Sequence, residues 1–546
     1  MMQIDDIKDL PKNLEYEKTN FFGPQILSAD VPSLKTVGSK AYNLIRMSKI
    51  GLPVPSGFVL GTQYCRNYYS NSGKLSENFE ELLLSNIRRL ENMTKFTFGG
   101  IRRPLFISVR SGAPVSMPGM MDTLLNIGLT KTTLDGLIRM TGNPHMAWDS
   151  YRRLIQTFAV LVHGCDAITF DRIIEDYSKQ ESLQVKEFDT ETMKNLTGEF
   201  LEIYAKQVGT EFPQKPVDQL VSAVETVFKS WNSPRAIQFR SIHNIDGILG
   251  TAVILQTMVF GNMGSTSGSG VAFTRNPSTG ENSLYMDFMF NAQGEDIVSG
   301  RLGMQDPDKI HRILPDIYQK IQETKRILEM EFKDAQDFEF TVQEGSLFLL
   351  QTRSAKRTNL AALKIAVDLV REGIIDTSTA LERIKDIDLK EIKQVKLDLK
   401  SDSKPLAVGI PASYGVAVGA IVLDPSVAEQ KKSAGKNVVL VREEISTNDI
   451  NGINACSGLL TSVGGKTSHA AVVARQMNKV CIVGCKGMSI DLKNRKISIK
   501  DIVLNEGDVI SLDGNSGNIY EGNLNITVDK PTLLLDEIER WKGTQK

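Results

Sequence analysis

Apolar and polar positions change their period several times along the chain, which predicts blocks of helices and blocks of strands. Residues from about 130 to 235 place apolar side chains at helical spacing, as in DSYRRLIQTFAVLVHGC (149–165). Short apolar runs typical of strands follow in GTAVILQTMVFGN (250–262), SGVAFTR (269–275) and SLYMDFMF (283–290). The pattern therefore predicts an α+β body that carries a helical insertion.

The remaining residues predict a second, smaller unit. Residues 386–405 alternate Lys and Asp without a convincing apolar stripe, which is typical of a solvated connector. Five short apolar runs then surround a helix that begins near His469, and residues 529–546 predict one amphipathic tail helix. We therefore expect an α/β multidomain chain, with a first domain over 1–385, the connector, and a second domain over 406–528.

Composition narrows the class of protein. A chain of 546 residues is too long for one ordinary core. The formal charge is -1, so no global field attracts nucleic acid or a membrane surface. The acidic start does not look like a secretory signal, and no apolar run approaches the roughly 20 residues that span a bilayer. The five cysteines are too scattered for a disulfide framework. We expect a cytoplasmic protein without a nucleic-acid or membrane partner.

The segment GGKTSHAAVVARQM (464–477) holds the candidate catalytic residue. The two glycines allow a sharp turn after an apolar strand, and Thr467 or Ser468 can cap the helix that follows. His469 then lies in the first helical turn, where free N–H groups can hold a phosphoryl group. The helix dipole also favours the neutral imidazole that a nucleophile needs. This arrangement predicts a phosphohistidine site, against the simpler interpretation of a histidine that only caps or packs.

Small residues after the histidine strengthen this interpretation. Ala470 and Ala471 are expected to leave space for a bulky phosphate donor. The whole segment resembles the phosphohistidine segment of pyruvate phosphate dikinases and of phosphoenolpyruvate-utilising enzymes generally. The family usually has Met where this chain has Lys466. The resemblance implies a swivelling β/β/α phosphohistidine domain, and it makes Thr467 a candidate for regulatory phosphorylation.

The same resemblance extends over nearly the whole chain, starting at GSKAYNL (38–44). It implies an ATP-grasp domain in which Lys40 and Arg110, the latter in SVRSGA, contact ATP phosphates. A lysine is a point charge for phosphate, and an arginine offers a planar fork of donors. The resemblance also implies a mobile lid in GAPVSMPGMMDT (112–123), and it places Gln256 and Met258 on the adenine side of the nucleotide.

A predicted hairpin near residue 344 carries candidate ligands for Mg²⁺. Asp337 and Glu339 share one face of the first strand, and Gln351 and Arg353 share one face of the second. A two-residue turn would send Gln351 to the wrong side, whereas a three-residue loop (344–346) opposes Glu339 to Gln351 and Asp337 to Arg353. We predict the three-residue loop. The resemblance places the family's magnesium ligands at Glu339 and Gln351, and ATP contacts at all four positions. The alternative is an amphipathic hairpin with one solvated face.

The resemblance implies a dikinase half-reaction that uses ATP, inorganic phosphate and Mg²⁺ to phosphorylate His469. The family then passes the phosphoryl group to pyruvate in a C-terminal barrel. Such a barrel needs about 250 residues, far more than follow residue 528, so we expect a barrel subunit or another acceptor on a separate chain. Two alternatives remain: an ATP-dependent phosphohistidine donor to an acceptor other than pyruvate, and a non-catalytic regulatory or relic protein.

Overall fold

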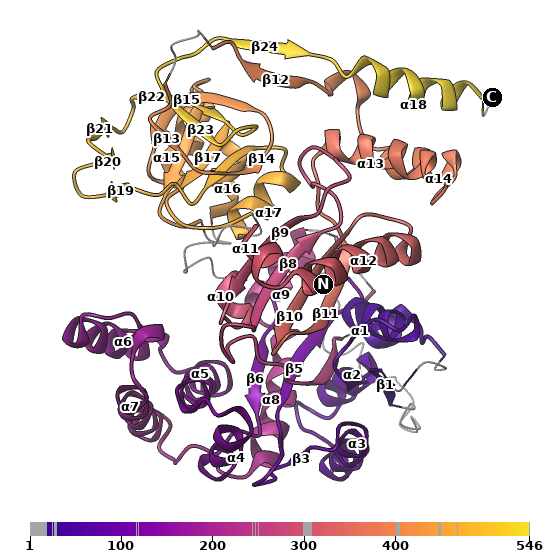
Figure 1. Ribbon diagram of the computed structural model, residues 1–546, viewed down its shortest axis with the longest axis vertical. Coiled ribbons are helices and arrows are strands. Elements are labelled where there is room, and N and C mark those ends of the chain that lie inside the picture. Colours follow the sequence, from indigo (N-terminus) through magenta and orange to yellow (C-terminus); the bar gives the residue numbers. More distant parts are fainter. Residues whose placement is uncertain are drawn as a thin grey trace. The chain divides into compact units, whose positions relative to one another are not determined.

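The chain is a mixed α/β protein that divides into two compact units, each described here by itself. The computed structural model in Figure 1 describes residues 19–24, 26, 30–115, 117, 120–242, 244–245, 247–248, 250–298, 308–399, 404–445, 449–466 and 468–544. The first unit comprises Met1–Val259 together with Phe348–Gln351, and the second comprises Phe260–Leu347 together with Thr352–Lys546.

The first unit is built on a five-stranded antiparallel sheet. Its strand order is β1-β2-β7-β5-β6, so the strand latest in sequence is inserted in the middle. The central strand β7 reads AVILQT and has five buried residues in six, as expected for a strand covered on both faces. The bounds are β1 Asn20–Phe22, β2 Gly57–Leu60, β5 Ile107–Gly112, β6 Thr123–Ile127 and β7 Ala252–Thr257, with a short pair β3 Thr97–Phe98 and β4 Pro104–Leu105.

Helices supply the rest of the first unit, and the predicted helical block is present. Its helices begin at side chains that accept hydrogen bonds from the first turn, as at Thr130, Asn143 and Asp189. Several end at a glycine in the left-handed region, whose N–H donates a hydrogen bond to a carbonyl of the last helical turn. The bounds are α1 Leu34–Lys49, α2 Thr62–Ser70, α3 Phe79–Thr94, α4 Lys131–Thr141, α5 Pro144–His163, α6 Ala167–Glu181, η2 Val185–Glu187, α7 Thr190–Val208, α8 Pro216–Ser230 and α9 Pro234–Ile242.

The second unit begins with a four-stranded sheet of order β11-β10-β8-β9. Strand β8 pairs antiparallel with β9 on one side and with β10 on the other. The strands are β8 Gly268–Phe273, β9 Tyr285–Phe290, β10 Gln336–Gln343 and β11 Ser346–Ser354, and the helices are α10 Gly294–Val298, α11 Asp308–Ile313, α12 Pro315–Phe332, α13 Asn359–Arg371 and α14 Thr377–Ile384.

The turn between β10 and β11 differs from the predicted three-residue loop. Only Glu344 and Gly345 separate the strands, and both have positive φ (47° and 72°), as in the two-residue turn that matches strand twist. Further along, the Ala355 N–H donates to the Ala335 carbonyl at 2.9 Å. From the turn to this pair β11 uses one residue more than β10, which is the signature of a β-bulge. The predicted loop length is therefore wrong, but the bulge restores the predicted meeting of Asp337 and Arg353, whose side chains form an ion pair.

Residues 386–405 are more ordered than a simple connector. They contain η3 (Leu389–Glu391) and strand β12 (Gln394–Leu397), which pairs antiparallel with β24 (Ile526–Asp529). The weak alternation in QVKL was masked by the dense charge of the segment, since a two-stranded ladder needs little apolar area on either face. The predicted tail helix is present as α18 (Thr532–Thr544), and its Ile538 is buried against α13 and α14.

An eight-stranded sheet of order β13-β23-β22-β15-β16-β17-β18-β14 forms the centre of the C-terminal part. Strands β15 to β18 are parallel and alternate with helices α15 to α17, which is the βαβ arrangement of buried parallel strands. The bounds are β13 Ala407–Val408, β14 Ile410–Ser413, β15 Val416–Val422, α15 Pro425–Ser433, β16 Val438–Arg442, α16 Ile450–Ala455, β17 Gly458–Thr461, α17 His469–Gln476, β18 Val480–Val483, β22 Val509–Asp513 and β23 Asn518–Glu521, with a separate three-stranded sheet of β19 Met488–Asp491, β20 Lys496–Ile499 and β21 Ile502–Asn505.

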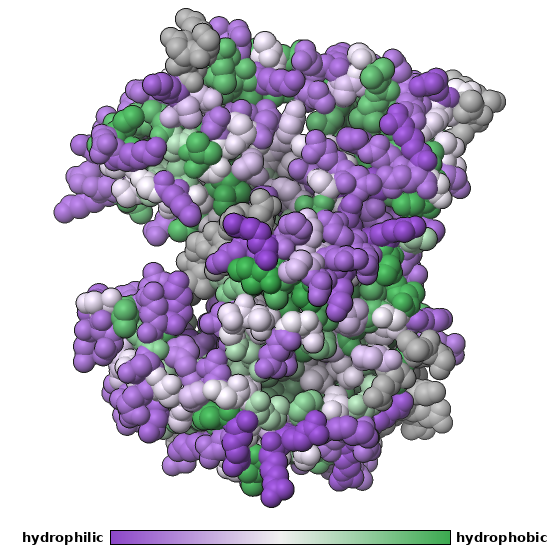
Figure 2. Space-filling model, viewed as in Figure 1, coloured by the Kyte–Doolittle hydropathy of each residue, from purple (hydrophilic) through white to green (hydrophobic). Residues whose placement is uncertain are grey.

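The molecular surface is mostly polar on the face shown in Figure 2, where hydrophobic residues form scattered patches among hydrophilic ones. Scattered exposed apolar residues are normal for a folded domain. Within the described ranges, no helix is both long and apolar enough to cross a lipid bilayer.

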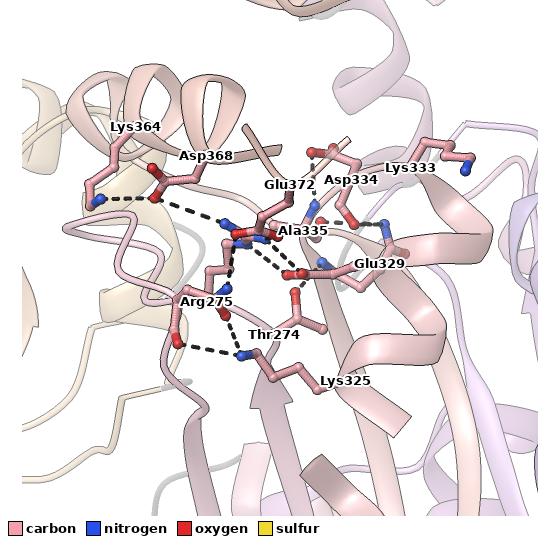
Figure 3. A network of polar contacts seen from close by, with 12 residues as sticks. Thr274, Arg275, Lys325, Glu329, Lys333, Asp334, Ala335, Lys364, Asp368 and Glu372 are labelled. Atoms are coloured by element: carbon pink, nitrogen blue, oxygen red, sulfur yellow. Dashed lines mark hydrogen bonds and ion pairs between the residues drawn. The ribbon is translucent and has the colours of Figure 1, made fainter. Parts of the chain in front are cut away.

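A buried charge network holds helices to the end of strand β8 (Figure 3). The Arg275 side chain is fully buried and donates to both carboxylate oxygens of Glu329 on α12 at 2.9 Å. It also donates to Glu372, just after α13, at 2.6 Å, and Asp368 lies 4.0 Å away. A buried cation of this kind is tolerated only because its partners are buried with it.

Replacing Arg275 is expected to destabilise the chain strongly. An Arg275→Met variant keeps the volume of the side chain but leaves the carboxylates of Glu329 and Glu372 without their cation. We expect a loss of about 3–5 kcal/mol in the free energy of unfolding, measured by urea denaturation of the full chain. The control is Lys385→Met, which breaks an exposed pair with Glu382 and should change the urea midpoint little. Equal urea midpoints for the two variants would contradict the conclusion that the buried Arg275 network stabilises the fold.

Candidate functional site

A glycine break in α1 brings the lysine of the first motif to the end of strand β5. Gly38 interrupts the helix with φ 76° and ψ 162°. A Cβ atom at this position would lie 1.8 Å from the Gly112 carbonyl oxygen, so only glycine permits this approach. Ser39 then donates from its N–H and its hydroxyl to the Ala113 carbonyl, both at 3.0 Å. Lys40 is half-buried directly after this junction.

Arg110 lies on strand β5 and is held by the backbone and side chain of β11. Its Nη1 donates to the Leu350 carbonyl at 3.1 Å, and its Nη2 donates to Gln351 Oε1 at 3.2 Å. Gln351 is itself buried. The guanidinium is therefore fixed in direction, which suits a group that must present a planar fork to an anion.

Gln256 and Met258 are engaged by the protein in ways that the sequence did not indicate. The buried Gln256 amide donates to the Pro55 carbonyl at 3.1 Å, and the Met258 N–H donates to the Phe106 carbonyl at 2.9 Å. Gln256 pairs with Ser108 on β5, so its side chain lies on the same sheet face as that of Arg110. Their predicted place on the adenine side stays a prediction.

In the second unit, strand register gathers three acidic side chains on one sheet face. Val271 lies opposite Asp287 on β9 and opposite Glu339 on β10, whereas Phe273 lies opposite Tyr285 and Asp337. Directly opposed residues share a face, and so do residues two apart along a strand. We call Asp287, Asp337 and Glu339 the acidic face. The sequence selected Asp337 and Glu339 as site residues and left the role of Asp287 open, because the register of β9 cannot be read from the chain.

The acidic face is partly neutralised from within the same unit. Asp337 is buried, and Arg353 Nε donates to its Oδ2 at 2.7 Å. Burial raises the pKa of the Asp337 carboxyl, although the Arg353 guanidinium acts in the opposite direction. Burial alone would lower the pKa of Arg353, but the charges of Asp337 and Glu339 raise it. In both groups, burial disfavours the charged form and the charge of the partner favours it.

The His469 backbone begins α17, at the carboxyl edge of the parallel strands. Strand β17 ends at Thr461, Gly464 turns the chain with φ 115°, and Ser468 occupies the N-cap position. Among the described residues, the Ser468 hydroxyl is buried and has no hydrogen-bond partner. Ser468 therefore does not make the expected capping hydrogen bond. The His469 side chain and the whole of Thr467 lie outside the described part of the chain.

The alanines after the histidine do not leave the space that was expected. Ala470 and Ala471 are buried in the core between α17 and the sheet, together with Ala474. Their small size therefore allows a close approach of the helix to β14 and β18. The expectation that they make room for a phosphate donor is wrong.

Sequence analysis missed Arg475 altogether. It is the penultimate residue of α17, and its side chain is fully buried and among the largest such side chains in the described part of the chain. The available signal was an arginine in a helix whose other residues are almost all small or apolar. The predicted lid at 112–123 is described only in part, since Ser116, Pro118 and Gly119 lie outside the described residues.

The candidate metal ligands have the right chemistry for Mg²⁺. Within the described ranges, no group of three or more His, Cys, Asp or Glu side chains is arranged to hold a metal ion. Mg²⁺ is commonly held by one or two carboxylates together with substrate phosphates and water. The predicted ligands Glu339 and Gln351 offer one carboxylate and one amide oxygen, which satisfies this lower requirement.

Comparison with known proteins identifies the family. The family model described as "Pyruvate phosphate dikinase, AMP/ATP-binding domain" matches residues 34–97 and 74–317, and the model described as "PEP-utilising enzyme, mobile domain" matches residues 434–517. The chain belongs to the pyruvate phosphate dikinase family. The first match contains Lys40 and Arg110, and the second contains His469, so the resemblance seen in these motifs is confirmed.

Curated pyruvate phosphate dikinases are similar over most of this chain. The protein of Clostridium symbiosum is 42% identical over 512 residues, which is 92% of this chain and 58% of the relative. The chloroplastic protein of Mesembryanthemum crystallinum is 42% identical over 508 residues, 92% of this chain and 53% of the relative. The protein of Rhizobium meliloti (strain 1021) is 41% identical over 526 residues, which is 93% of this chain and 58% of the relative. The chain thus spans little more than half the length of these relatives.

The Gly38 break can be tested against a second glycine of similar conformation. Gly38→Ala forces a Cβ atom against the Gly112 carbonyl, so we expect a loss of more than about 2 kcal/mol in the free energy of unfolding. The control Gly51→Ala has φ 80° but no atom within 4 Å, so it should cost only backbone strain, about 1 kcal/mol. Urea midpoints of the full chain measure both, and similar losses would show that the close approach does not matter.

Proposed function

We propose that this chain catalyses the phosphorylation of His469 by ATP and inorganic phosphate, the first half of a dikinase reaction. The observation that carries the proposal is that one chain matches both the AMP/ATP-binding model and the mobile-domain model, with His469 inside the second match. The relatives named above carry the name pyruvate, phosphate dikinase and support the same reaction class.

We propose an ATP-grasp fold for residues 1–385 and a swivelling phosphohistidine domain for residues 406–528. In this assignment Lys40 and Arg110 offset the charge of the ATP phosphates, and Asp337 and Arg353 complete the nucleotide site. The hydrogen bonds that fix Arg110 on Leu350 and Gln351 support its role, because a pre-oriented guanidinium stabilises developing charge without reorganisation.

The proposed reaction proceeds in two displacements. The neutral imidazole of His469 attacks the β-phosphorus of ATP, forming a nitrogen–phosphorus bond while the bond to AMP breaks. Inorganic phosphate then attacks the γ-phosphorus and the bond between the γ-phosphorus and the β–γ bridging oxygen breaks, so that the γ-phosphoryl group departs in pyrophosphate and the β-phosphoryl group stays on His469. Little covalent chemistry is required of other side chains, because phosphoryl transfer depends mainly on positioning and on neutralising charge.

Mg²⁺ would be held by Glu339 and Gln351, and its chemistry when bound is to polarise the phosphoryl oxygens. Oxygen donors of this kind suit a hard cation. The final acceptor, which we expect to be pyruvate or another compound bound by a separate chain, remains part of the proposal. Regulation through Thr467 also stays a prediction.

The half-reaction is tested with ATP labelled at either the β or the γ phosphorus. We expect acid-labile β label to persist on the protein after phosphate is added, while γ label leaves as pyrophosphate. His469→Ala should abolish both signals, whereas His311→Ala, which removes an exposed histidine, should retain them. If neither label binds the folded wild-type chain, the catalytic proposal fails and a nucleotide binder without catalysis is the better description.

The metal assignment is tested by the Mg²⁺ dependence of label incorporation. Glu339→Gln removes one negative charge from the proposed ligand set. We expect the Mg²⁺ concentration at half-maximal incorporation to rise by at least the roughly 10- to 100-fold that follows the loss of an outer-shell partner. Glu344→Gln changes an exposed residue of the same hairpin and serves as the control. An unchanged Mg²⁺ dependence in the Glu339 variant would remove this residue from the metal site.

A further inference from the structure

Two cations of the histidine segment lie against two neighbouring aromatic rings of the four-stranded sheet. The Lys466 ammonium, three residues before His469, is 4.5 Å from the centroid of the Tyr285 ring. The Arg475 guanidinium, six residues after it, is 5.1 Å from the centroid of the Phe273 ring. Tyr285 and Phe273 are themselves paired across β9 and β8, with an edge-to-face contact of 6.1 Å. All of these residues belong to the second unit.

Arg475 also fixes the backbone on both sides of this contact. Its Nη1 donates to the Lys466 carbonyl at 2.9 Å and to the Ala412 carbonyl at 2.8 Å. The first bond ties the end of α17 to the loop that leads into His469, and the second ties it to strand β14. A lysine could not make both bonds from the same planar group and still stack on a ring.

The burial of Arg475 is costly and therefore informative. The side chain has no exposed surface, and its Nε and Nη2 have no hydrogen-bond partner among the described residues. Burial lowers the pKa of the guanidinium, while Tyr285, Cys481, Asp337 and Asp287 act in the opposite direction. A cation that is incompletely hydrogen-bonded is retained only where nearby negative charge compensates it. Here two members of the acidic face, Asp287 and Asp337, supply that charge.

Three neutral hydrogen bonds join the same two surfaces. The Tyr285 hydroxyl donates to the Pro411 carbonyl at 2.9 Å, and the Ser278 hydroxyl donates to the Ala412 carbonyl at 3.3 Å. The Asn359 N–H donates to Asn478 Oδ1 at 3.0 Å. The contact is therefore specific in direction, and the histidine segment lies on the sheet that carries the acidic face.

We propose that Lys466 and Arg475 are positioning residues that hold the His469 segment over the acidic face for phosphoryl transfer. Arg475 sets the loop through the Lys466 carbonyl, and Lys466 attaches the loop to the Tyr285 ring. The inference rests on the proposed function, because positioning matters only if His469 accepts a phosphoryl group.

The first test separates positioning from nucleotide binding. Arg475→Lys and Lys466→Ala are compared with the exposed Lys436→Ala for incorporation of β label over a range of ATP concentrations. Loss of a cation–π contact changes an equilibrium by about 2- to 30-fold. We expect the maximal rate constant of incorporation to fall by this factor in Lys466→Ala and by at least tenfold in Arg475→Lys, with the ATP concentration at half-maximal rate unchanged. A higher half-maximal ATP concentration with an unchanged maximal rate constant would mean that the side chains bind ATP and would overturn the positioning role, and so would unchanged values of both.

The second test does not depend on catalysis. Hydrogen exchange of the backbone amides in β14 and in α17 should accelerate in both variants but not in Lys436→Ala. A double-mutant cycle with Lys466→Ala and Tyr285→Leu should show coupling in this exchange, since each change removes the contact between the Lys466 ammonium and the Tyr285 ring. This cycle also decides the proposal if Arg475→Lys does not fold. Additive effects, or exchange that matches wild type, would overturn the proposal. If the wild-type chain takes no label at all, the proposed function fails, whereas the exchange data still decide whether the two cations hold the segment.

Discussion

The pairing of strand β8 on both of its edges is the constraint on which the second unit depends. One edge sets Val271 opposite Asp287, and the other sets Val271 opposite Glu339, so a single register brings acidic residues from strands about 50 residues apart onto one face. A shift by one residue on either edge would turn one of these carboxylates to the other side of the sheet. Directly beyond the strand, Arg275 joins the same element to α12 and α13.

Charge is used differently by the two buried arginines at the C-terminal end of this strand. Arg275 has two carboxylates in direct contact, so its charge is balanced where it lies. Arg475 instead donates to two carbonyls and lies over an aromatic ring, and the charges that act on it include those of Asp287 and Asp337 on the acidic face. The first arrangement fixes the architecture. The arrangement around Arg475 leaves a buried cation, and the electrostatic environment of that cation depends on which charged groups are bound at the acidic face.

Sequence patterns predicted the elements well and the contacts between them less well. The helical block, the alternating strands and helices around His469, and the tail helix follow from local periodicity, which is preserved in the fold. The bulge in β11 could not be predicted, because an extra residue in a strand leaves no mark in an otherwise regular alternation. Strand β12 was hidden by its charges, and Arg475 by the expectation that arginines lie at the surface.

The candidate site shows the same division. His469 could be selected from the glycine, hydroxyl and small residues around it, which are typical of sites that bind phosphate, whereas Lys40 and Arg110 were selected through the family resemblance. The role of Ala470 and Ala471 was misjudged, since a small side chain creates a close contact as readily as an open space, and only the packed helix distinguishes the two. Placing Asp287 on the acidic face required the register of β9 on β8, which is a property of two strands and not of one.

The Arg275 network also limits how this part of the chain can change over evolutionary time. Arg275, Glu329 and Glu372 lie far apart in sequence, yet none of them can become apolar alone without leaving an opposite charge buried. A path to an uncharged core at this position requires several substitutions, and its intermediates are less stable than either end. These three positions should therefore vary together among relatives or not at all, so that one ion network restrains the sequence drift of a strand and two helices.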